Sequence, residues 1–339
     1  MRKGISAVSL LAAGALALTA CGSGDDGGTT TASAGGGAVS IDFSFEWTCE
    51  GNWPIMYIAD EKGYLAEENL EVNYVRGQGG SATVPLVGAG EQDMGALSAP
   101  AVVLGAGQGL PITVVGVAAV ESPVVIVADE SIKEPKDLEG KKLAVQLQQF
   151  EGAVWKSFVS ATGIDESKIE VTNAGNDSST LFLDHRVDAI VVFEPTPSVW
   201  ALTEGREGGE TIIRMQDYVP TYGHTIVANN DFLKKNPEAV RGMLRAWAKA
   251  TKYAVEHPDE ALELLERNCT ELTPETAKFT TEKYIAAYST EQSKENGYLW
   301  FDPSGLDQTK KVLVDAGLME DVDLADHIST DYLPDPAIK

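Results

Sequence analysis

Residues 45–72 read FEWTCEGNWPIMYIADEKGYLAEENLEV, and this stretch decides the fold. The apolar segment 41–45 predicts a strand, and a loop carrying Trp47, Asn52 and Trp53 follows it. A helix is expected to begin near Pro54, because proline suits a first helical turn, and the alternation of Leu70 and Val72 predicts a second strand. Open α/β sheets place ligands beyond strand ends and beside helix N-termini, so the loop predicts a binding wall. The alternative is that both tryptophans belong to the core.

Composition and charge narrow the class of protein. The chain has 339 residues, a length that suits two lobes better than one core. Its formal net charge is -25. Such an acidic chain lacks the basic face that nucleic acid requires, and it lacks a polybasic membrane patch. We therefore expect no nucleic-acid partner.

The N-terminus has the pattern of a secretory signal. Arg2 and Lys3 precede an apolar run over residues 5–18, which is short for a spanning helix. The sequence Leu18-Thr19-Ala20-Cys21 resembles the bacterial lipobox, in which the cysteine is acylated. We interpret residues 1–20 as a signal peptide and 21–39 as a flexible tether, which predicts a lipid-anchored protein on the extracytoplasmic side of the cell membrane. The alternative is an ordinary signal peptide with an incidental Cys21.

Two further cysteines, Cys49 and Cys269, lie far apart in the chain. An oxidising compartment permits a disulfide between them, and the sequence leaves that bond open. No histidine has the spacing to cysteine that a zinc site requires, so we expect no metal site.

Strand and helix patterns alternate after the first lobe. Apolar strands flank the polar turn Glu121-Ser122-Pro123, which is either a hairpin or a crossing between lobes. Residues 143–192 alternate between strand and helix, which predicts parallel pairing. A strand over 222–228 is a second candidate crossing, and helices are expected from Asp231 onward, with apolar residues such as Val240, Leu244 and Trp247 at helical spacing.

This order of segments resembles the solute-binding proteins of ABC importers. Within them it is most similar to the group of thiamine-pyrimidine-precursor-binding proteins and yeast pyrimidine synthases, with sulfonate and taurine binders as more distant relatives. The residues that carry the resemblance are Trp47, Asn52, Tyr57-Ile58-Ala59, Lys62-Gly63-Tyr64-Leu65, Asn69-Leu70-Glu71-Val72, Asp93-Met94-Gly95, Asp137-Leu138, Gly140-Lys141-Lys142, Asp188-Ala189, Asn230-Asp231-Phe232-Leu233, Asn236-Pro237-Glu238, His257-Pro258, Trp300-Phe301-Asp302, Gly317-Leu318 and Leu333-Pro334.

The resemblance implies an α/β, two-lobed type II periplasmic-binding-protein fold with a hinge and an interlobe cleft. The first lobe would hold residues 40–122 and 226–339, and the second would hold residues 123–225. A monomer would trap a small aromatic heterocycle, most readily a hydroxymethyl- or aminomethyl-pyrimidine, by closing on it. It would then pass the ligand to a membrane permease driven by a cytoplasmic ATPase.

A heterocycle needs a stacking wall and a few fixed polar groups. Trp47 is expected to form the wall, with Asn52 as a donor and acceptor. Glu194 is expected to accept from an exocyclic amine, the alternative being a solvated carboxylate. The predicted ligand-binding residues are Trp47, Asn52, Trp53, Ser98, Gln148, Phe150, Glu151, Glu194 and Tyr222. His224 is expected to pack at the hinge.

Two other ligands and two other classes of protein compete with this prediction. The yeast synthases carry a lysine and a histidine shortly after Asp-Met-Gly, whereas here Ala96, Leu97 and Ser98 follow Gly95, so we expect no enzyme and no cofactor. An alkanesulfonate or taurine-like anion would favour an arginine, and Arg76 and Arg186 are the candidates. A flavin would also want aromatic stacking. An adhesive lipoprotein that has lost transport is the third class, and a filled cleft would favour it.

Overall fold

The computed structural model describes residues 37–147, 150–174, 177–195, 199 and 210–339. The predicted signal peptide, Cys21 and Gln148 lie outside these residues. Residues 38–339 form one compact unit. In the part described, no helix is long and apolar enough to cross a membrane.

The first sheet combines four early strands with one late strand. Its order is β2-β1-β3-β10-β4, and β1 runs parallel to β2 and β3, whereas β10 runs antiparallel to β3 and β4. The strands are β1 (Val39–Phe45), β2 (Leu70–Arg76), β3 (Met94–Ser98), β4 (Ile112–Val117) and β10 (His224–Asn229). The predicted strands at 41–45 and 70–72 are confirmed. Tyr222, which we placed in the last strand, precedes it.

The second sheet has the order β7-β6-β8-β5-β9. Strand β6 pairs in parallel with β7 and β8, which confirms the parallel pairing predicted from the alternating pattern. The strands are β5 (Val124–Asp129), β6 (Lys142–Val145), β7 (Glu170–Asn173), β8 (Ala189–Phe193) and β9 (Glu210–Arg214). Because β4 and β5 belong to different sheets, residues 118–123 are a crossing and not a hairpin.

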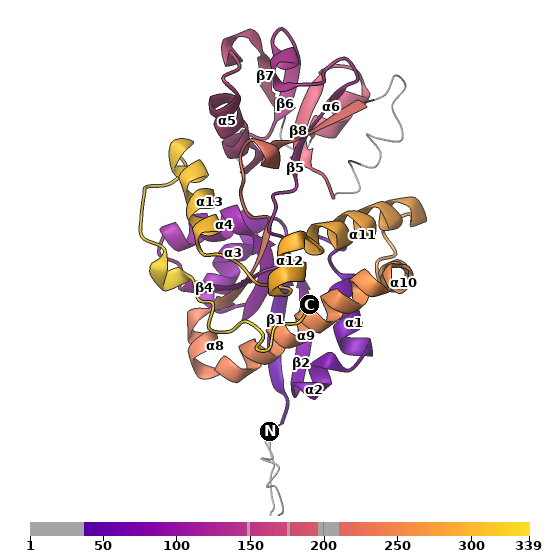
Figure 1. Cartoon of the computed structure of the whole chain (residues 1–339), viewed down its shortest axis with the longest axis vertical. Coiled ribbons are helices and arrows are strands. Elements are labelled where there is room, and N and C mark those ends of the chain that lie inside the picture. Colours follow the sequence, from indigo (N-terminus) through magenta and orange to yellow (C-terminus); the bar gives the residue numbers. More distant parts are fainter. Residues whose placement is uncertain (1–36, 148–149, 175–176, 196–198, 200–209) are drawn as a thin grey trace, which may run out of the picture. The chain divides into compact units, whose positions relative to one another are not determined.

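Helices cover both faces of the first sheet. Figure 1 shows α1 and α9 on one side and α3 and α4 on the other. The helices of the N-terminal part are α1 (Pro54–Glu61), α2 (Tyr64–Glu67), α3 (Gly80–Ala89), α4 (Ala99–Gly107), α5 (Phe150–Thr162) and α6 (Ser178–Leu183). Those of the C-terminal part are α8 (Asn230–Lys235), α9 (Pro237–Glu256), α10 (Pro258–Asn268), α11 (Pro274–Tyr288), α12 (Glu291–Asn296) and α13 (Ser304–Asp315).

Two apolar cores hold these layers together. The first lies between the first sheet and α9, where Trp247 packs against Phe43 with ring centroids 5.4 Å apart. Val240, Leu244 and Trp247 are all buried, as their helical spacing predicts. The second core takes residues from both sheets, and α13 contacts α4 on one side and α5 on the other. The two sheets are therefore linked by a shared apolar cluster as well as by the chain crossings.

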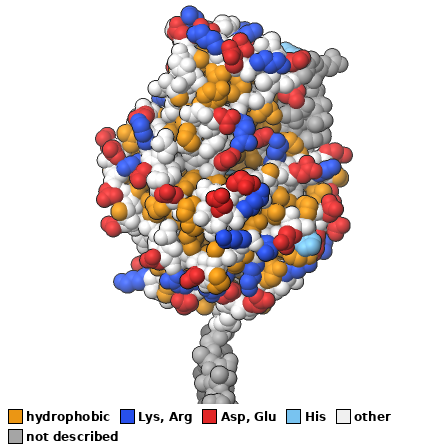
Figure 2. Space-filling model, in the orientation of Figure 1, with side chains coloured by type: hydrophobic (Ala, Val, Ile, Leu, Met, Phe, Trp, Pro, Cys, Tyr) orange, Lys and Arg blue, Asp and Glu red, His pale blue; other side chains and the backbone are white. Residues whose placement is uncertain are grey.

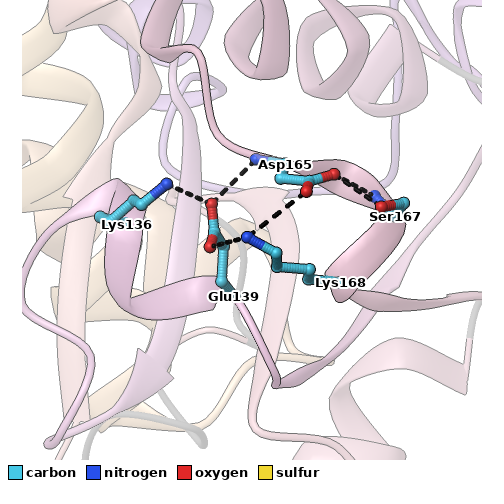
Figure 3. A network of polar contacts seen from close by, with 5 residues as sticks. All are labelled: Lys136, Glu139, Asp165, Ser167 and Lys168. Atoms are coloured by element: carbon cyan, nitrogen blue, oxygen red, sulfur yellow. Dashed lines mark hydrogen bonds and ion pairs between the residues drawn. The ribbon is translucent and has the colours of Figure 1, made fainter.

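A polar network ties two turns of the second sheet (Figure 3). Glu139, just after the 3₁₀ turn Pro135–Leu138, accepts hydrogen bonds from the Lys136 ammonium, the Asp165 backbone N–H and the Lys168 ammonium. Asp165 in turn accepts from the Ser167 backbone and hydroxyl. The hydrogen bond from Lys136, helped by those from Asp165 and Lys168, lowers the pKa of Glu139 to about 2. The network joins the turn before β6 to the turn before β7.

The low pKa of Glu139 predicts a pH-dependent contribution to stability. Its pKa in the folded protein lies below the unfolded value of about 4.3, so the network stabilises the fold above that pH. The contribution is lost as the pH falls toward the folded value of about 2. Glu139→Gln should lower the free energy of unfolding at about pH 7, and its difference from wild type should shrink at about pH 3. Urea unfolding at both pH values measures this. The exposed Glu91→Gln is the control, and a Glu139→Gln deficit that stays constant with pH would contradict the assignment.

Candidate functional site

The candidate site begins where β1 and β3 end side by side. Glu46 follows β1, and Ser98 is the last residue of β3. The Ser98 backbone N–H donates to Glu46 Oε2 at 2.5 Å, and the Ser98 hydroxyl donates to Glu46 Oε1 at 2.8 Å. Parallel strands bring their carboxyl ends to one edge of a sheet, which is why these two residues meet. The edge thus carries a fixed carboxylate.

A buried histidine faces this carboxylate from the neighbouring strand. His224 begins β10 and lies opposite Ser98, with its Nε2 atom 3.8 Å from Glu46 Oε2. Burial lowers the pKa of His224, and the negative charge of Glu46 only partly opposes that effect. We therefore expect a neutral imidazole at pH 7. This buried position agrees with the packing role predicted for His224.

Glycines let the chain approach Glu46 closely. The Gly79 backbone N–H donates to the Glu46 carbonyl at 2.8 Å, and Gly80 starts α3 beside the same residue. A Cβ atom at Gly80 would lie 2.4 Å from Glu46 Oε1, so only glycine fits there. A Cβ atom at Gly79 would lie 3.6 Å from the Trp47 ring, which places that ring against the loop. The Trp47 side chain is 47% exposed, so it can stack on a ligand.

Trp53, the second predicted tryptophan, is buried in the first core. Its ring stacks on Phe45 at a centroid distance of 4.3 Å, and its Nε1–H donates to the Thr48 carbonyl at 3.0 Å. This is the alternative that we kept open for both tryptophans. It holds for Trp53, whereas Trp47 is exposed.

The loop between Trp47 and Trp53 lies on α11. The Tyr284 hydroxyl donates to Glu50 Oε1 at 3.0 Å, and the Gly51 backbone N–H donates to the Thr280 hydroxyl. Burial raises the pKa of Glu50 to about 8; the hydrogen bond from Tyr284 opposes this shift, and the charge of Glu46 adds to it. Glu50 is therefore largely neutral at pH 7. Asn52 is also buried in this loop.

The same loop is joined to the end of α10 by a disulfide. Cys49 and Cys269 are bonded, with Cα atoms 5.7 Å apart and 220 residues between them along the chain. Both sulfur atoms also lie near the Tyr57 hydroxyl of α1. The bond therefore fixes the loop that carries Glu50 and Asn52 against the late helices.

The second sheet contributes Phe150 and Glu151 at the start of α5. The Phe150 ring lies 6.3 Å from the ring of Phe193, at the end of β8. Burial raises the pKa of Glu151 to about 7, and the negative charge of Glu46 raises it further against a backbone hydrogen bond. Carboxylates from the two sheets are therefore close enough to repel each other. Of the residues predicted beside the second sheet, Glu151 thus lies near enough to Glu46 for the two charges to interact.

Glu194 forms an ion pair with Lys283 of α11. It follows β8, and its Oε1 atom lies 2.5 Å from the Lys283 ammonium of α11. Both side chains are partly buried. Glu194 is thus already paired in this structure, a contact that the sequence did not indicate.

Tyr222 and Arg76 make their contacts away from Glu46. The Tyr222 hydroxyl donates to the Asp302 carbonyl at 2.9 Å, and its ring packs against Gly305. Arg76 pairs with Glu271 at 2.5 Å, and Arg186 is exposed. The binding role of Tyr222 stays a prediction, as do those of the other residues named from the sequence.

Charged side chains of both signs are spread over the surface, and a surface pocket lies apart from the candidate site. Figure 2 shows acidic and basic side chains interspersed over one face. A surface pocket of about 470 Å³ lies at α1 and the junction of α9 and α10. It is lined by Glu61, Glu256, His257, Pro258, Asp259, Glu260, Glu263, Leu264 and Arg267, none of which is a predicted site residue.

Sequence reasoning missed the central residue. Glu46 lies within the opening stretch, directly after a predicted strand, so the strand-end rule could have selected it. Glu50 could have been selected because it lies in the loop that follows the same strand. Tyr284 and Lys283 had no such signal, because their contacts join a late helix to residues that lie far away in the chain.

The architecture identifies the class of fold to which the protein belongs. The structure matches the periplasmic aliphatic sulphonate binding protein SsuA from Escherichia coli with a TM-score of 0.70 and 18% identity, over 86% of this chain and 92% of that chain. It matches the alkanesulfonate-binding protein SsuA from Xanthomonas axonopodis pv. citri with a TM-score of 0.66 and 14% identity, over 87% and 99%. The fold is that of the periplasmic binding proteins, as predicted.

The chain belongs to the NMT1/THI5-like family, whose sequence profile matches residues 51–261. It is 26% identical over 235 residues to the formylaminopyrimidine-binding protein of Halalkalibacterium halodurans, covering 68% of this chain and 70% of the relative. It is 26% identical over 226 residues to a putative thiamine biosynthesis protein of Haemophilus influenzae, covering 65% and 71%. A 4-amino-5-hydroxymethyl-2-methylpyrimidine phosphate synthase of Saccharomyces cerevisiae, THI11, is 24% identical over 220 residues, covering 61% and 64%. These matches confirm the predicted resemblance.

The disulfide predicts a stability cost on reduction. Residues 38–339 contain two cysteines, Cys49 and Cys269, so this part of the chain should show no free thiol before reduction. Reduction should lower the free energy of unfolding by about 2–5 kcal/mol, because it frees a long loop in the unfolded chain. Thiol counting and urea unfolding with and without reductant measure both effects, and the Cys49→Ser/Cys269→Ser variant is the control that reductant should not affect. Two free thiols in the unreduced protein would contradict the bond.

Proposed function

We propose that the protein is the extracytoplasmic solute-binding component of an ABC importer, and that it captures a thiamine pyrimidine precursor. The ligand would be a hydroxymethyl- or aminomethyl-pyrimidine held between a first lobe of residues 40–122 and 226–339 and a second lobe of residues 123–225. The observation that carries the proposal is the exposed Trp47 ring next to the fixed Glu46 carboxylate at the end of β1. The named pyrimidine-binding relative supports the same ligand class.

The charges at the site favour an amine-bearing ring over an anion. The Glu46 carboxylate, which Ser98 holds in place, would accept a hydrogen bond from an N–H or O–H group of the ligand, whereas its charge would repel a sulfonate. Arg76, the first-lobe candidate for an anion, is paired with Glu271. The likeness to sulfonate binders is therefore one of fold. An alkanesulfonate and a flavin are the alternative ligands in the test below.

Binding without catalysis is the activity we propose. Strand β3 (Met94–Ser98) carries neither lysine nor histidine, the residue types that the yeast synthases place after the same Asp-Met-Gly sequence. Its last residue, Ser98, is used to hold Glu46. Both observations support a binding protein over a synthase. We propose that it acts as a monomer and delivers its ligand to a permease driven by an ATPase.

Ligand identity is testable by thermal unfolding of residues 38–339. A ligand that binds only the folded state adds roughly 2.7 kcal/mol at a hundredfold excess over Kd. We expect a large rise in Tm with aminopyrimidine precursors and little with thiamine, riboflavin, taurine or alkanesulfonates. Trp47→Ala should abolish the rise, whereas Tyr218→Ala, which truncates another exposed aromatic side chain, should leave it unchanged. A rise with sulfonates alone would replace the proposal by an anion-binding function.

The lipid anchor is tested separately through Cys21. Acylation at this residue would hold the full chain on the membrane, because two or more acyl chains bind far more stably than one. Cys21→Ala should therefore move the protein from the membrane fraction to the medium or periplasm. Fractionation with immunoblotting, with Cys49→Ser/Cys269→Ser as the control, measures this. A Cys21→Ala protein that stays in the membrane fraction would contradict anchoring.

A further inference from the structure

Four buried polar atoms near the candidate site lack hydrogen-bond partners. They are Glu50 Oε2, Asn52 Oδ1, Thr281 Oγ1 and Tyr288 OH, and none has a partner among the residues that the structure describes. Their side chains are only 2–5% exposed. Buried polar groups are nearly always hydrogen-bonded, so a group of this size points to a missing partner.

These atoms belong to one place in the first lobe. Thr281, Tyr284 and Tyr288 are spaced three and four residues apart, which puts them on one face of α11. Tyr284 donates to Glu50 at 3.0 Å, and the rings of Tyr284 and Tyr288 are 5.9 Å apart. The Gly51 contact with Thr280 holds the loop on the same helix. The loop therefore supplies two of the atoms and the helix supplies the other two.

The cluster adjoins the strand-end site. The His224 ring, which faces Glu46, lies 5.8 Å from the Tyr284 ring. The charge of Glu46 also acts on both Glu50 and Tyr284. The cluster therefore lies close to Glu46, the residue that precedes Trp47 in the chain.

The donor and acceptor pattern specifies the kind of group that fits. Glu50 is largely neutral at pH 7, and because its Oε1 accepts from Tyr284, the proton is expected on Oε2, which then donates. Asn52 Oδ1 can only accept, whereas the two hydroxyls can do either. The missing partner must therefore offer an acceptor and a donor side by side, without a net charge. The N=C–NH₂ edge of an aminopyrimidine has this pattern.

We propose that Glu50, Asn52, Thr281 and Tyr288 form a neutral subsite that binds the N=C–NH₂ edge of the pyrimidine. The inference rests on the proposed function and assigns to these residues the recognition of the amino group. Glu46 and Trp47 then contact the rest of the ring. A subsite of this kind discriminates strongly between pyrimidines with and without the amino group, since a ligand that lacks the group leaves the buried polar atoms unpaired.

The test compares two ligands in isothermal titration calorimetry with full-length mature protein. The probes are 4-amino-5-hydroxymethyl-2-methylpyrimidine and the same compound without its amino group. Tyr288→Phe and Thr281→Val should each weaken binding of the amino compound by about tenfold. Neither variant should weaken binding of the compound without the amino group by more than about twofold, because that compound has no amino group for the hydroxyl to bind. Both variants should fold, since each removes a hydroxyl that has no partner.

Matched controls remove hydroxyls elsewhere in the first lobe. Tyr74→Phe removes a hydroxyl that bonds the Met56 carbonyl, and Thr251→Val removes one that bonds the Trp247 carbonyl. Both should bind the two probes as wild type does. If Tyr288→Phe and Thr281→Val also bind the amino compound as wild type does, the subsite is wrong and buried water satisfies the four atoms. If the wild-type protein binds neither probe, the proposed function fails and the subsite fails with it. The wild-type isotherm therefore distinguishes a failure of the proposed function from a failure of the subsite alone.

Discussion

The pair of hydrogen bonds from Ser98 to Glu46 is the interaction on which the candidate site depends. It holds a carboxylate at the shared end of β1 and β3, where water reaches it only partly. A fixed negative charge in such a place acts on its neighbours more strongly than an exposed one would. It opposes the neutral state of His224 and favours the neutral states of Glu50 and Glu151. Burial is the main cause of these pKa shifts, and the charge held by this contact between strands adds to two of them and opposes the third.

Helix α11 gives this arrangement its second support, because it is shared between the two sheets. One face turns Tyr284 and Tyr288 into the first core. Lys283 reaches Glu194 at the end of β8, and Phe279 packs against an apolar cluster of the second sheet. A single helix therefore contacts both walls of the proposed ligand site. Any change in the position of one sheet relative to α11 would alter the environment of Glu194 directly.

Local patterns in the sequence were enough to predict the strands at each end of the opening stretch, the helix from Pro54 and the buried face of α9. They also predicted the parallel part of the second sheet, since strand and helix alternate there. The site was only partly predictable. Trp47 and Trp53 have the same local signal, and only packing against Phe45 separates the buried one. Glu50 meets Tyr284 across 234 residues, a pairing that no periodicity encodes.

If the proposed lipid anchor holds the protein by its N-terminal end, the disulfide has a mechanical consequence. Cys49 lies just after β1 and Cys269 just after α10, so all strands of the second sheet fall inside a covalently closed ring. A pull applied between the N-terminal tether and the C-terminus would pass from β1 through the sulfur bridge to α11. The second sheet would carry none of that tension. Among the strands that the structure describes, β1 alone lies on the covalent path of such a pull, so the disulfide would shield the other strands of both sheets from it.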